Sequence, residues 1–495
     1  MINTINKEVE AKMLRPLFFF EDRGGSAMRD KRRNIIVFAV LILAAGTVYK
    51  IPYLRAVFYD QMISSLGVTH TELGILSSVY AGVKMVLYIP CGILADRLNT
   101  KRLLVFSLIG ESILTGLYAL IPAFWVIEMI QAGMALVNIF FWTSFIKSIR
   151  ILGKDSSQGK IFGLGEGFRG ITGSAATLVA LQIVTVFAER TCPIRYVLIF
   201  YTVYYFLVGI CIWKFYPNNL REAEGHRQTW RDYVEVMKKP AIWLVSLLIF
   251  TTYSMQVAFE YTTSYMTQVI GISAVTVGTV ATLRDNICGV VGSPMAGAWA
   301  DRIKSPTRVA FYLLLIEIAL CILLFFSPES REFGPALIGL ILIISVVLYG
   351  VRGVYYSTMS ETGIPVSLTA TATAMVAVLG YTPDMFMTLW CGHILDTYGY
   401  QAGYHRIFGL MILFVCLAAA ICVVMLRYQR RIAKRHCNSE TGCIPGKIAE
   451  PFYELNKEKG ETQDECKSKK MDRIHCFNAG CGPDLQSSVP QNRIL

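Results

Sequence analysis

The sequence predicts an all-α membrane protein built from two similar halves, and two observations lead to this prediction. Of the 495 residues, 54% are apolar and only 17% are charged, which is typical of proteins that cross a membrane several times rather than of soluble enzymes. A charged turn that follows one long apolar segment recurs at an offset of 205 residues, from Asp96 to Asp301. A repeat of this size indicates two pseudo-symmetric bundles.

Twelve apolar segments are long enough to span a bilayer. A hydrocarbon core of roughly 30 Å requires about 20 residues of helix. Runs of this length are unlike the short alternating strands of a membrane barrel, and an open strand edge cannot be satisfied in lipid. We therefore expect transmembrane helices at approximately 34–62, 71–95, 102–121, 123–149, 160–187, 193–215, 240–268, 274–299, 307–327, 334–358, 366–394 and 403–427.

These segments divide the chain into two six-helix bundles with polar flanks. We expect an N-terminal extension at 1–33, bundles at 34–215 and 240–427, a linker at 216–239 and a disordered tail at 428–495. The extension has no cleavage-site pattern and is not a secretory signal peptide. Lys and Arg gather in alternate loops, so the positive-inside rule places both termini in the cytoplasm, with the plasma (inner) membrane as the expected location. The net charge of +12 is then topological and predicts no affinity for nucleic acid.

The charged turn has the same pattern in both copies. The first reads Gly92-Ile93-Leu94-Ala95-Asp96-Arg97 and the second Gly297-Ala298-Trp299-Ala300-Asp301-Arg302. Both resemble the conserved loop of the major facilitator superfamily, which lies between its second and third helices and again between its eighth and ninth. The resemblance covers about residues 34–427. It implies a monomeric transporter with a cavity between the bundles and alternating access by rocking of one bundle against the other.

The resemblance also implies a conformational latch at this turn. In the superfamily, the aspartate lies near a helix N-terminus at the interface between the halves, pairs with an arginine, and is released when the cytoplasmic side opens. The second copy has Ser305-Pro306 where the superfamily usually has Gly and Arg, and the first has Asn99-Thr100. The expected latch residues are Gly92, Asp96, Arg97, Lys101, Arg102 and Arg150, with Asp301 and Arg302 as the second-half equivalents.

The first predicted helix is unusually polar, with Tyr49, Lys50, Tyr53 and Arg55 close together. A cation in hydrocarbon costs about 2.5–3.5 kcal/mol even on lenient insertion scales, so such groups normally face a cavity or a partner. The run is similar to the first helix of organophosphate:phosphate antiporters, whose arginine binds the substrate phosphate. The alternative for Arg55 is that its side chain extends to the outer membrane surface.

Two deep cations lie in the second and eighth predicted helices. Lys84 precedes Asp96 by twelve residues, or roughly 18 Å of helix, which places it near mid-membrane. Its alternative role is an ion pair with Glu111 or Glu166. Neighbours on a helix point about 100° apart, so Arg284 need not be neutralised by Asp285. The pair Lys84 and Arg284 resembles the two arginines that hold the anion in nitrate/nitrite porters.

A third pair of cations is related by the repeat offset. Lys147 and Arg352 are separated by the same 205 residues as the two aspartates of the charged turns. The two side chains could hold an anion between the halves, or they could be ordinary positive-inside residues. The sequence leaves both possibilities open.

Buried carboxylates are the candidate proton carriers. Glu260, Asp285 and Asp384 lie in the seventh, eighth and eleventh predicted helices, and Asp384 follows a Pro-broken turn at Gly380-Tyr381-Thr382-Pro383. Desolvation disfavours the charged form of a carboxylate, which allows it to hold a proton near physiological pH, although a structural ion pair explains each acid equally well. The Cys and His residues of the tail match no metal motif, so we expect neither a metal nor a cofactor.

The function that follows is secondary transport of a small organic or inorganic anion, by proton symport or by exchange. The chain has no Walker motif, so ATP does not drive it directly, and no nucleophile or metal constellation supports an enzyme. The alternative is a transporter-like receptor that binds a solute and signals through its tail. The expected substrate contacts are Tyr49, Lys50, Tyr53, Arg55, Lys84, Lys147, Arg284 and Arg352.

Overall fold

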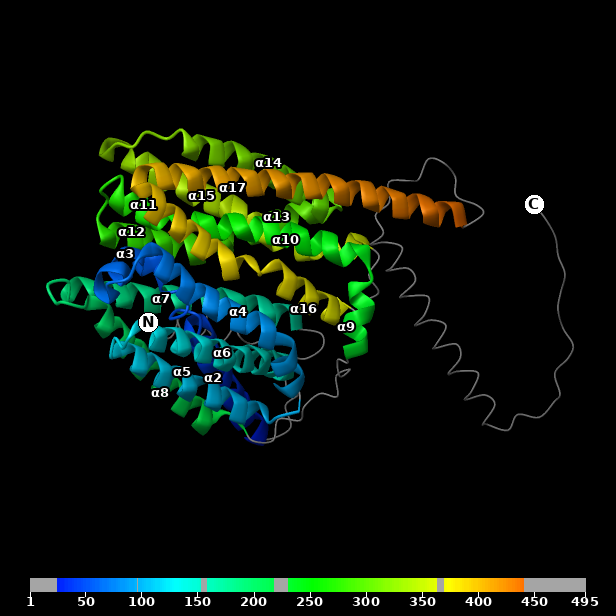
Figure 1. Ribbon diagram of the computed structural model, residues 1–495. Helices are drawn as coiled ribbons and strands as arrows, with labels where there is room; N and C mark the ends of the chain where they lie inside the picture. The colour runs from blue at the N-terminus through cyan, green and yellow to red at the C-terminus, as the bar shows by residue number, and fades with distance from the viewer. Residues whose placement is uncertain (1–24, 96, 153–157, 218–229, 363–368, 440–495) are drawn as a thin grey trace, which may run out of the picture. The chain divides into compact units, whose positions relative to one another are not determined.

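The computed structural model describes residues 25–95, 97–152, 158–217, 230–362 and 369–439. Within these ranges every regular element is a helix (Figure 1). The described residues up to Tyr428 belong to one compact unit. The described part contains nine helices that are long and apolar enough to cross a membrane. The prediction of an all-helical membrane protein is confirmed, whereas the number twelve stays a prediction because several of the expected segments are split or joined.

The elements of the first half of the chain follow the expected segments closely. They are α2 (Gly25–Thr47), α3 (Arg55–Leu66), α4 (His70–Ala95), α5 (Thr100–Ala119), α6 (Phe124–Leu152), α7 (Gln158–Val186) and α8 (Pro193–Phe215). The first expected helix, at 34–62, is divided between α2 and α3. Pro52 lies in the gap, and proline both lacks an N–H and clashes with the carbonyl four residues earlier. The break places Lys50 and Tyr53 in a non-helical turn.

The second half is more interrupted. It follows the short α9 (Trp230–Met237) and comprises α10 (Pro240–Phe259), α11 (Thr262–Gln268), α12 (Ala274–Thr282), the π-helix η2 (Leu283–Ile287), α13 (Cys288–Ile303), α14 (Pro306–Phe325), the 3₁₀ turn η3 (Arg331–Phe333), α15 (Gly334–Val354), η4 (Tyr356–Thr362), α16 (Thr369–Gly380) and α17 (Pro383–Ser439). The expected break before Asp384 separates α16 from α17. The last two expected spans are joined in α17 through Gly399, whose φ of 70° suits glycine.

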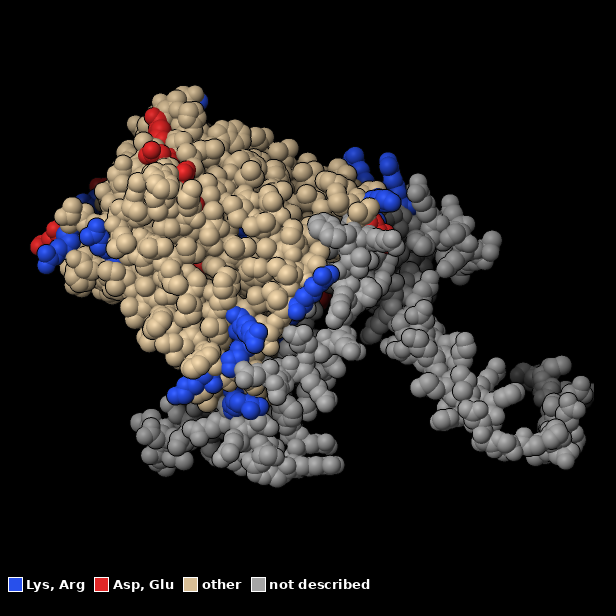
Figure 2. All heavy atoms as spheres, turned by 60° about the horizontal axis from the view of Figure 1, so that its bottom comes forward, with Lys and Arg blue, Asp and Glu red and all other residues tan. Residues whose placement is uncertain are grey.

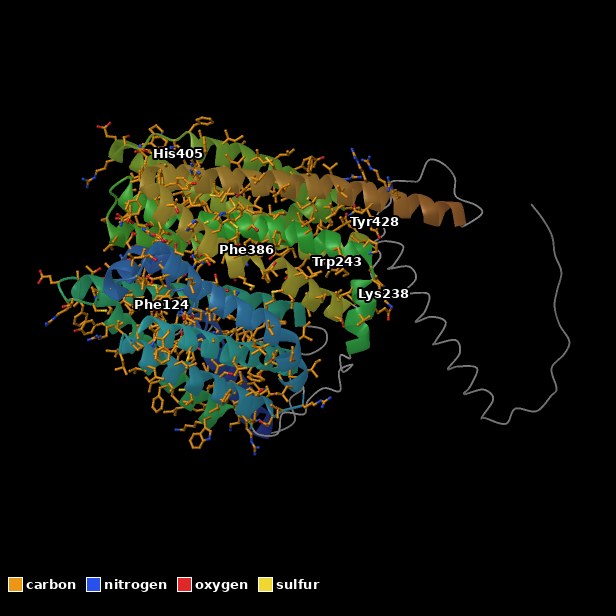
Figure 3. All side chains as sticks on the ribbon, in the orientation of Figure 1. Phe124, Lys238, Trp243, Phe386, His405 and Tyr428 are labelled. Carbon is orange, nitrogen blue, oxygen red and sulfur yellow. The ribbon has the colours of Figure 1, made fainter. Side chains whose placement is uncertain are left out.

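The surface of the described part is largely uncharged. In Figure 2 a broad area without charge occupies the face in view, and many blue Lys and Arg side chains lie where the described surface meets the grey atoms. Large apolar side chains such as Val86, Met129 and Ile113 are more than half exposed. In a membrane protein these groups face lipid rather than water. In Figure 3 Lys238, Trp243 and Tyr428 lie at one end of the helices, with Phe124 and His405 toward the other.

Small residues bring helices from the two halves into backbone contact. A Cβ added to Gly74 of α4 would lie 2.7 Å from the carbonyl oxygen of Thr388, and one added to Gly392 of α17 would lie 2.3 Å from the carbonyl oxygen of His70. Glycine at both positions therefore permits close packing of the type that membrane helices prefer. This contact lies at the end of α4 opposite the charged turn.

We expect Gly392→Ala to separate α4 from α17 at this end. The new methyl group overlaps the His70 carbonyl, and overpacking of this kind costs roughly 1–3 kcal/mol. Hydrogen exchange of the amides at 70–74, followed by mass spectrometry, should become faster. The matched control is Gly339→Ala, since a Cβ there meets nothing within 4 Å. Unchanged exchange in Gly392→Ala would show that the two helices are not held together by this packing.

Candidate functional site

Asp384 lies where three helical segments from both halves meet. It is the second residue of α17, directly after the break, and is only 7% exposed. The hydroxyl of Tyr53, in the turn between α2 and α3, donates to Asp384 Oδ2 at 2.6 Å. The hydroxyl of Tyr253, in α10, donates to the same oxygen at 2.9 Å. These hydrogen bonds to a carboxylate are of the strong, charge-assisted type, so Asp384 links the halves.

Arg55 is buried and paired across the two halves. Its guanidinium Nη2 lies 3.1 Å from Glu260 Oε2, and Nε donates to Ser77 Oγ of α4 at 2.8 Å. The Arg55 side chain is only 2% exposed, so the alternative that it extends to the outer membrane surface is wrong. Glu260 is the residue directly after α10, where that helix ends. Arg55, an expected substrate contact, and Glu260, an expected proton carrier, therefore form an ion pair with each other.

Arg284 is neutralised by its neighbour. Its Nε and Nη2 lie 2.8 and 3.3 Å from the two oxygens of Asp285, and Nη1 donates to Thr263 Oγ1 at 3.1 Å. The inference that these neighbours need not neutralise each other is wrong. Both residues lie in the π-helical turn η2, where the 100° spacing of an α-helix does not hold, and the long arginine side chain reaches back to its neighbour.

Lys84 has a different environment. Its Nζ lies 4.9 Å from the ring centre of Tyr49 and 5.6 Å from that of Tyr80, within the range of cation–π attraction. It forms no ion pair among the described residues, whose ion pairs are Arg55–Glu260, Arg284–Asp285 and His405–Glu329. The alternative pair with Glu111 is therefore wrong. The side chain of Glu166 lies outside the described residues.

Two further cations, Arg352 and Lys50, lie beside uncharged residues. Arg352, half-buried in α15, donates from Nη1 to Gln256 Oε1 of α10 at 2.9 Å, and its guanidinium lies 5.1 Å from the ring centre of Tyr349. The aliphatic part of Lys50 packs at Gly173 of α7, where Cε would lie 3.2 Å from an added Cβ. No ion pair of Lys50 or Arg352 occurs within the described ranges.

The offset partners Lys147 and Arg352 have unlike surroundings. Lys147 Nζ donates to the carbonyl oxygen of Ala95, the last residue of α4, at 3.0 Å. A cation at this position satisfies a free carbonyl and interacts favourably with the helix dipole. Arg352 bonds an amide side chain instead. Their role in binding an anion together stays a prediction.

Part of the expected latch lies outside the described residues, namely Asp96 and the side chain of Arg150. Arg97, Arg102, Asp301 and Arg302 are exposed, Lys101 is half-buried, and an added Cβ at Gly92 would meet nothing within 4 Å. The residues that differ from the superfamily pattern have a local explanation. Asn99 caps α5 by accepting from the Arg102 amide at 3.1 Å, and Ser305 caps α14. The latch stays a prediction.

One set of contacts between the halves could not be predicted from local patterns in the sequence. Asp396 of α17 accepts from the amides of His70 and Thr71, at 3.2 and 2.7 Å, and so caps the start of α4. Nearby, Ser264 Oγ donates to Asp60 Oδ1 at 2.7 Å. A cap supplied from more than 300 residues away leaves no local pattern. These contacts hold the halves together at the end opposite the charged turns.

Comparison with known proteins decides the family. The family model described as Major Facilitator Superfamily matches residues 35–383. The chain belongs to the Major Facilitator Superfamily. It is therefore an integral, multi-pass membrane protein that transports a small molecule, and not an enzyme.

Relatives and solved structures agree with membership of the Major Facilitator Superfamily. The chain is 29% identical over 377 residues to the inner membrane protein YqcE of Escherichia coli, covering 74% of this chain and 88% of that protein. It is 27% identical to YihN of the same organism, covering 82% and 97%. These names support the plasma membrane as its location.

Two solved transporters share the fold at low identity. A bacterial homolog of the human lysosomal transporter Spinster, inward-facing and unoccupied, has a TM-score of 0.67 at 16% identity and covers 81% of this chain and 98% of that one. The nucleoside transporter NupG has a TM-score of 0.58 at 13% identity, with 80% and 98% covered. At this identity the likeness concerns the fold alone.

The Arg55–Glu260 pair generates a stability prediction. Arg55→Met alone leaves a buried carboxylate without its cation, which typically costs about 3–5 kcal/mol. The double variant Arg55→Met, Glu260→Leu removes both charges and should unfold at a higher temperature than Arg55→Met. Thermal unfolding of detergent-purified protein measures this, with exposed Arg195→Met as the control. If the loss of stability in the double variant equals the sum of the losses in Arg55→Met and Glu260→Leu, the two side chains do not interact directly.

Proposed function

We propose that this transporter moves a small organic or inorganic anion, by proton symport or by exchange. The observation that carries the proposal is the environment of Lys84. Its ammonium group lies beside the rings of Tyr49 and Tyr80 and forms no ion pair among the described residues. A half-buried cation at membrane depth without an ion pair is costly, and a bound anion would lower that cost.

In the described part of the chain the deep cations fall into two groups, those paired with a carboxylate and those without an ion pair, and we assign a different role to each group. Arg55 and Arg284 each lie beside a carboxylate and are only 2% exposed, which suits a structural link between helices. Lys50, Lys84 and Arg352 are half-buried, and in the described ranges they lie beside aromatic rings, an amide or a glycine. We assign the main anion contacts to these three side chains, two from the first half and one from the second.

Asp384 is the proton site that fits this arrangement best. Protonation turns its carboxylate into a neutral acid and weakens the two charge-assisted bonds from Tyr53 and Tyr253. Because the bond from Tyr53 joins the two halves, loss of the charge would favour their separation at this point. A proton taken up by Asp384 can thereby bias the equilibrium between the two orientations of the cavity.

We expect anions, and not neutral sugars or amines, to raise the melting temperature of the purified protein. A ligand at 100 times its dissociation constant stabilises the folded state by about 2.7 kcal/mol. Lys84→Ala should lose the effect and Lys84→Arg should retain part of it. Exposed Lys238→Ala is the matched control. Equal stabilisation of Lys84→Ala and the parent protein would exclude Lys84 as an anion contact.

A second test separates coupling from binding. With the stabilising anion in proteoliposomes, Asp384→Asn should abolish accumulation driven by an inward proton gradient but leave exchange of internal for external anion. The side chain of Asn keeps an oxygen acceptor for the tyrosines and carries no titratable proton. Gradient-driven accumulation that survives in Asp384→Asn would place the proton site elsewhere. Binding without flux by the parent protein would favour a receptor.

A further inference from the structure

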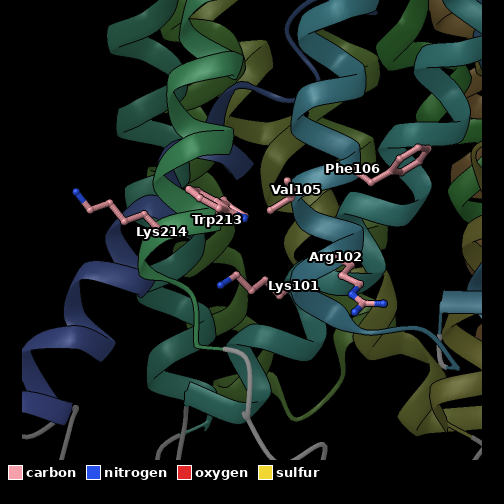
Figure 4. A pocket seen from close by; sticks show the side chains of 6 residues that line it. All are labelled: Lys101, Arg102, Val105, Phe106, Trp213 and Lys214. Atoms are coloured by element: carbon pink, nitrogen blue, oxygen red, sulfur yellow. The ribbon is translucent and has the colours of Figure 1, made fainter.

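A basic pocket lies on the outer side of the first half, far along the helices from Asp384. It has a volume of about 690 Å³ and is formed by the start of α5 and the end of α8 (Figure 4). In that view Lys101, Val105 and Trp213 point into the space between the two helices, while Arg102 and Lys214 lie at its sides. Phe106 completes the lining.

The pocket is lined by aromatic side chains that favour lipid and by cations that favour water or an anion. Trp213 is 65% exposed and Phe106 is 52% exposed, and on a bilayer-spanning helix such groups lie against lipid. Lys101 and Arg102 are in the first turn of α5 and Lys214 is in the last turn of α8, so the three cations lie at similar depth. The helices are held together directly, because Ser112 Oγ donates to the Thr202 carbonyl at 2.8 Å.

The repeat does not reproduce the residues that line the pocket. The 205-residue offset places Pro306 and Thr307 opposite Lys101 and Arg102. It places Ala418 and Ala419 at the positions of Trp213 and Lys214. The second half has a cation near the same helix end, Arg308 in the first turn of α14, but alanine in place of Trp213. The combination of cations with an exposed tryptophan is therefore specific to the first-half positions.

We propose that this pocket binds the headgroup of an anionic phospholipid from the cytoplasmic leaflet. Lys101 contacts the phosphate from within the pocket, Arg102 and Lys214 lie at its sides, and Trp213, Val105 and Phe106 contact the upper part of an acyl chain. Basic pockets between transmembrane helices on the cytoplasmic side favour anionic headgroups in this way. A lipid is the occupant that fits, because the pocket combines cations with aromatic side chains exposed toward the bilayer, whereas a soluble anion would use the cations alone.

Native mass spectrometry of the full chain tests the proposal. Phosphatidylglycerol should bind at least about tenfold more tightly than phosphatidylcholine, and the variant Lys101→Ala, Arg102→Ala, Lys214→Ala should lose roughly 100-fold in affinity for phosphatidylglycerol. The matched control removes three exposed cations assigned to the same membrane face, as Lys238→Ala, Arg308→Ala, Arg427→Ala, and should bind like the parent protein. Equal affinity for the two lipids, or equal losses in both variants, would overturn the proposal.

Fluorescence locates the lipid independently and requires only one conservative variant. Phosphatidylglycerol with brominated acyl chains should quench the parent protein more than Trp213→Phe, since Trp213 is one of seven tryptophans and lines the pocket. Millimolar inorganic phosphate should leave this difference unchanged. Displacement by phosphate would assign the pocket to a soluble anion, and a missing difference would show that no acyl chain reaches Trp213. Both results would overturn the proposal without affecting the transport proposal.

Discussion

The packing of the two halves depends on one constraint, namely that a charge removed from water must be satisfied inside the protein. Arg55 pairs with Glu260 across the halves, Arg284 pairs with Asp285, and Asp384 accepts two tyrosine hydroxyls. Each contact offsets a desolvation cost of several kcal/mol, and two of the three bridge the halves. The halves therefore meet through polar side chains that are expensive to separate without a replacement.

The polar and charged side chains of these contacts lie where the helices are broken. Tyr53 follows Pro52 in the gap between α2 and α3, Glu260 ends α10, Arg284 lies in η2, and Asp384 follows Pro383. Broken helices leave main-chain groups without a helical partner, and at membrane depth these must be buried in protein or line a cavity. Arg284 Nη2 also donates to the Ala56 carbonyl of α3 at 3.4 Å, a further contact between the halves. The interruptions thus place polar side chains where the two halves meet.

Local patterns in the sequence predicted the class of fold and the break at Pro383 because these depend on apolar run length and on proline. They also identified Glu260 and Asp384 as intramembrane acids. Partners distant in the chain could not be found from local patterns, so Arg55 was left between a cavity and the outer surface. The conformation of η2 was also unpredictable, because no residue type requires a π-helical turn.

One signal for the Arg55 partner was nevertheless present. Arg55 and Glu260 are separated by 205 residues, as are Asp96 and Asp301. In a protein with two-fold pseudo-symmetry, a residue can touch its own repeat equivalent only near the axis. Opposite charges at equivalent positions of the first and seventh predicted helices were therefore a sign of an axial pair. Lys147 and Arg352 share the offset but have separate partners, so they do not mark the axis in this way.

The cap on α4 has a consequence for how the protein can vary. Asp396 holds this helix through the main-chain amides of His70 and Thr71, and an amide is present whatever side chain follows, proline excepted. The two amide bonds would therefore survive a change of side chain at either position, whereas the bond that the Thr71 hydroxyl also donates to Asp396 would not. Correlated substitution, the usual statistical mark of two residues in contact, would then report only the hydroxyl bond and not the two amide bonds of the cap.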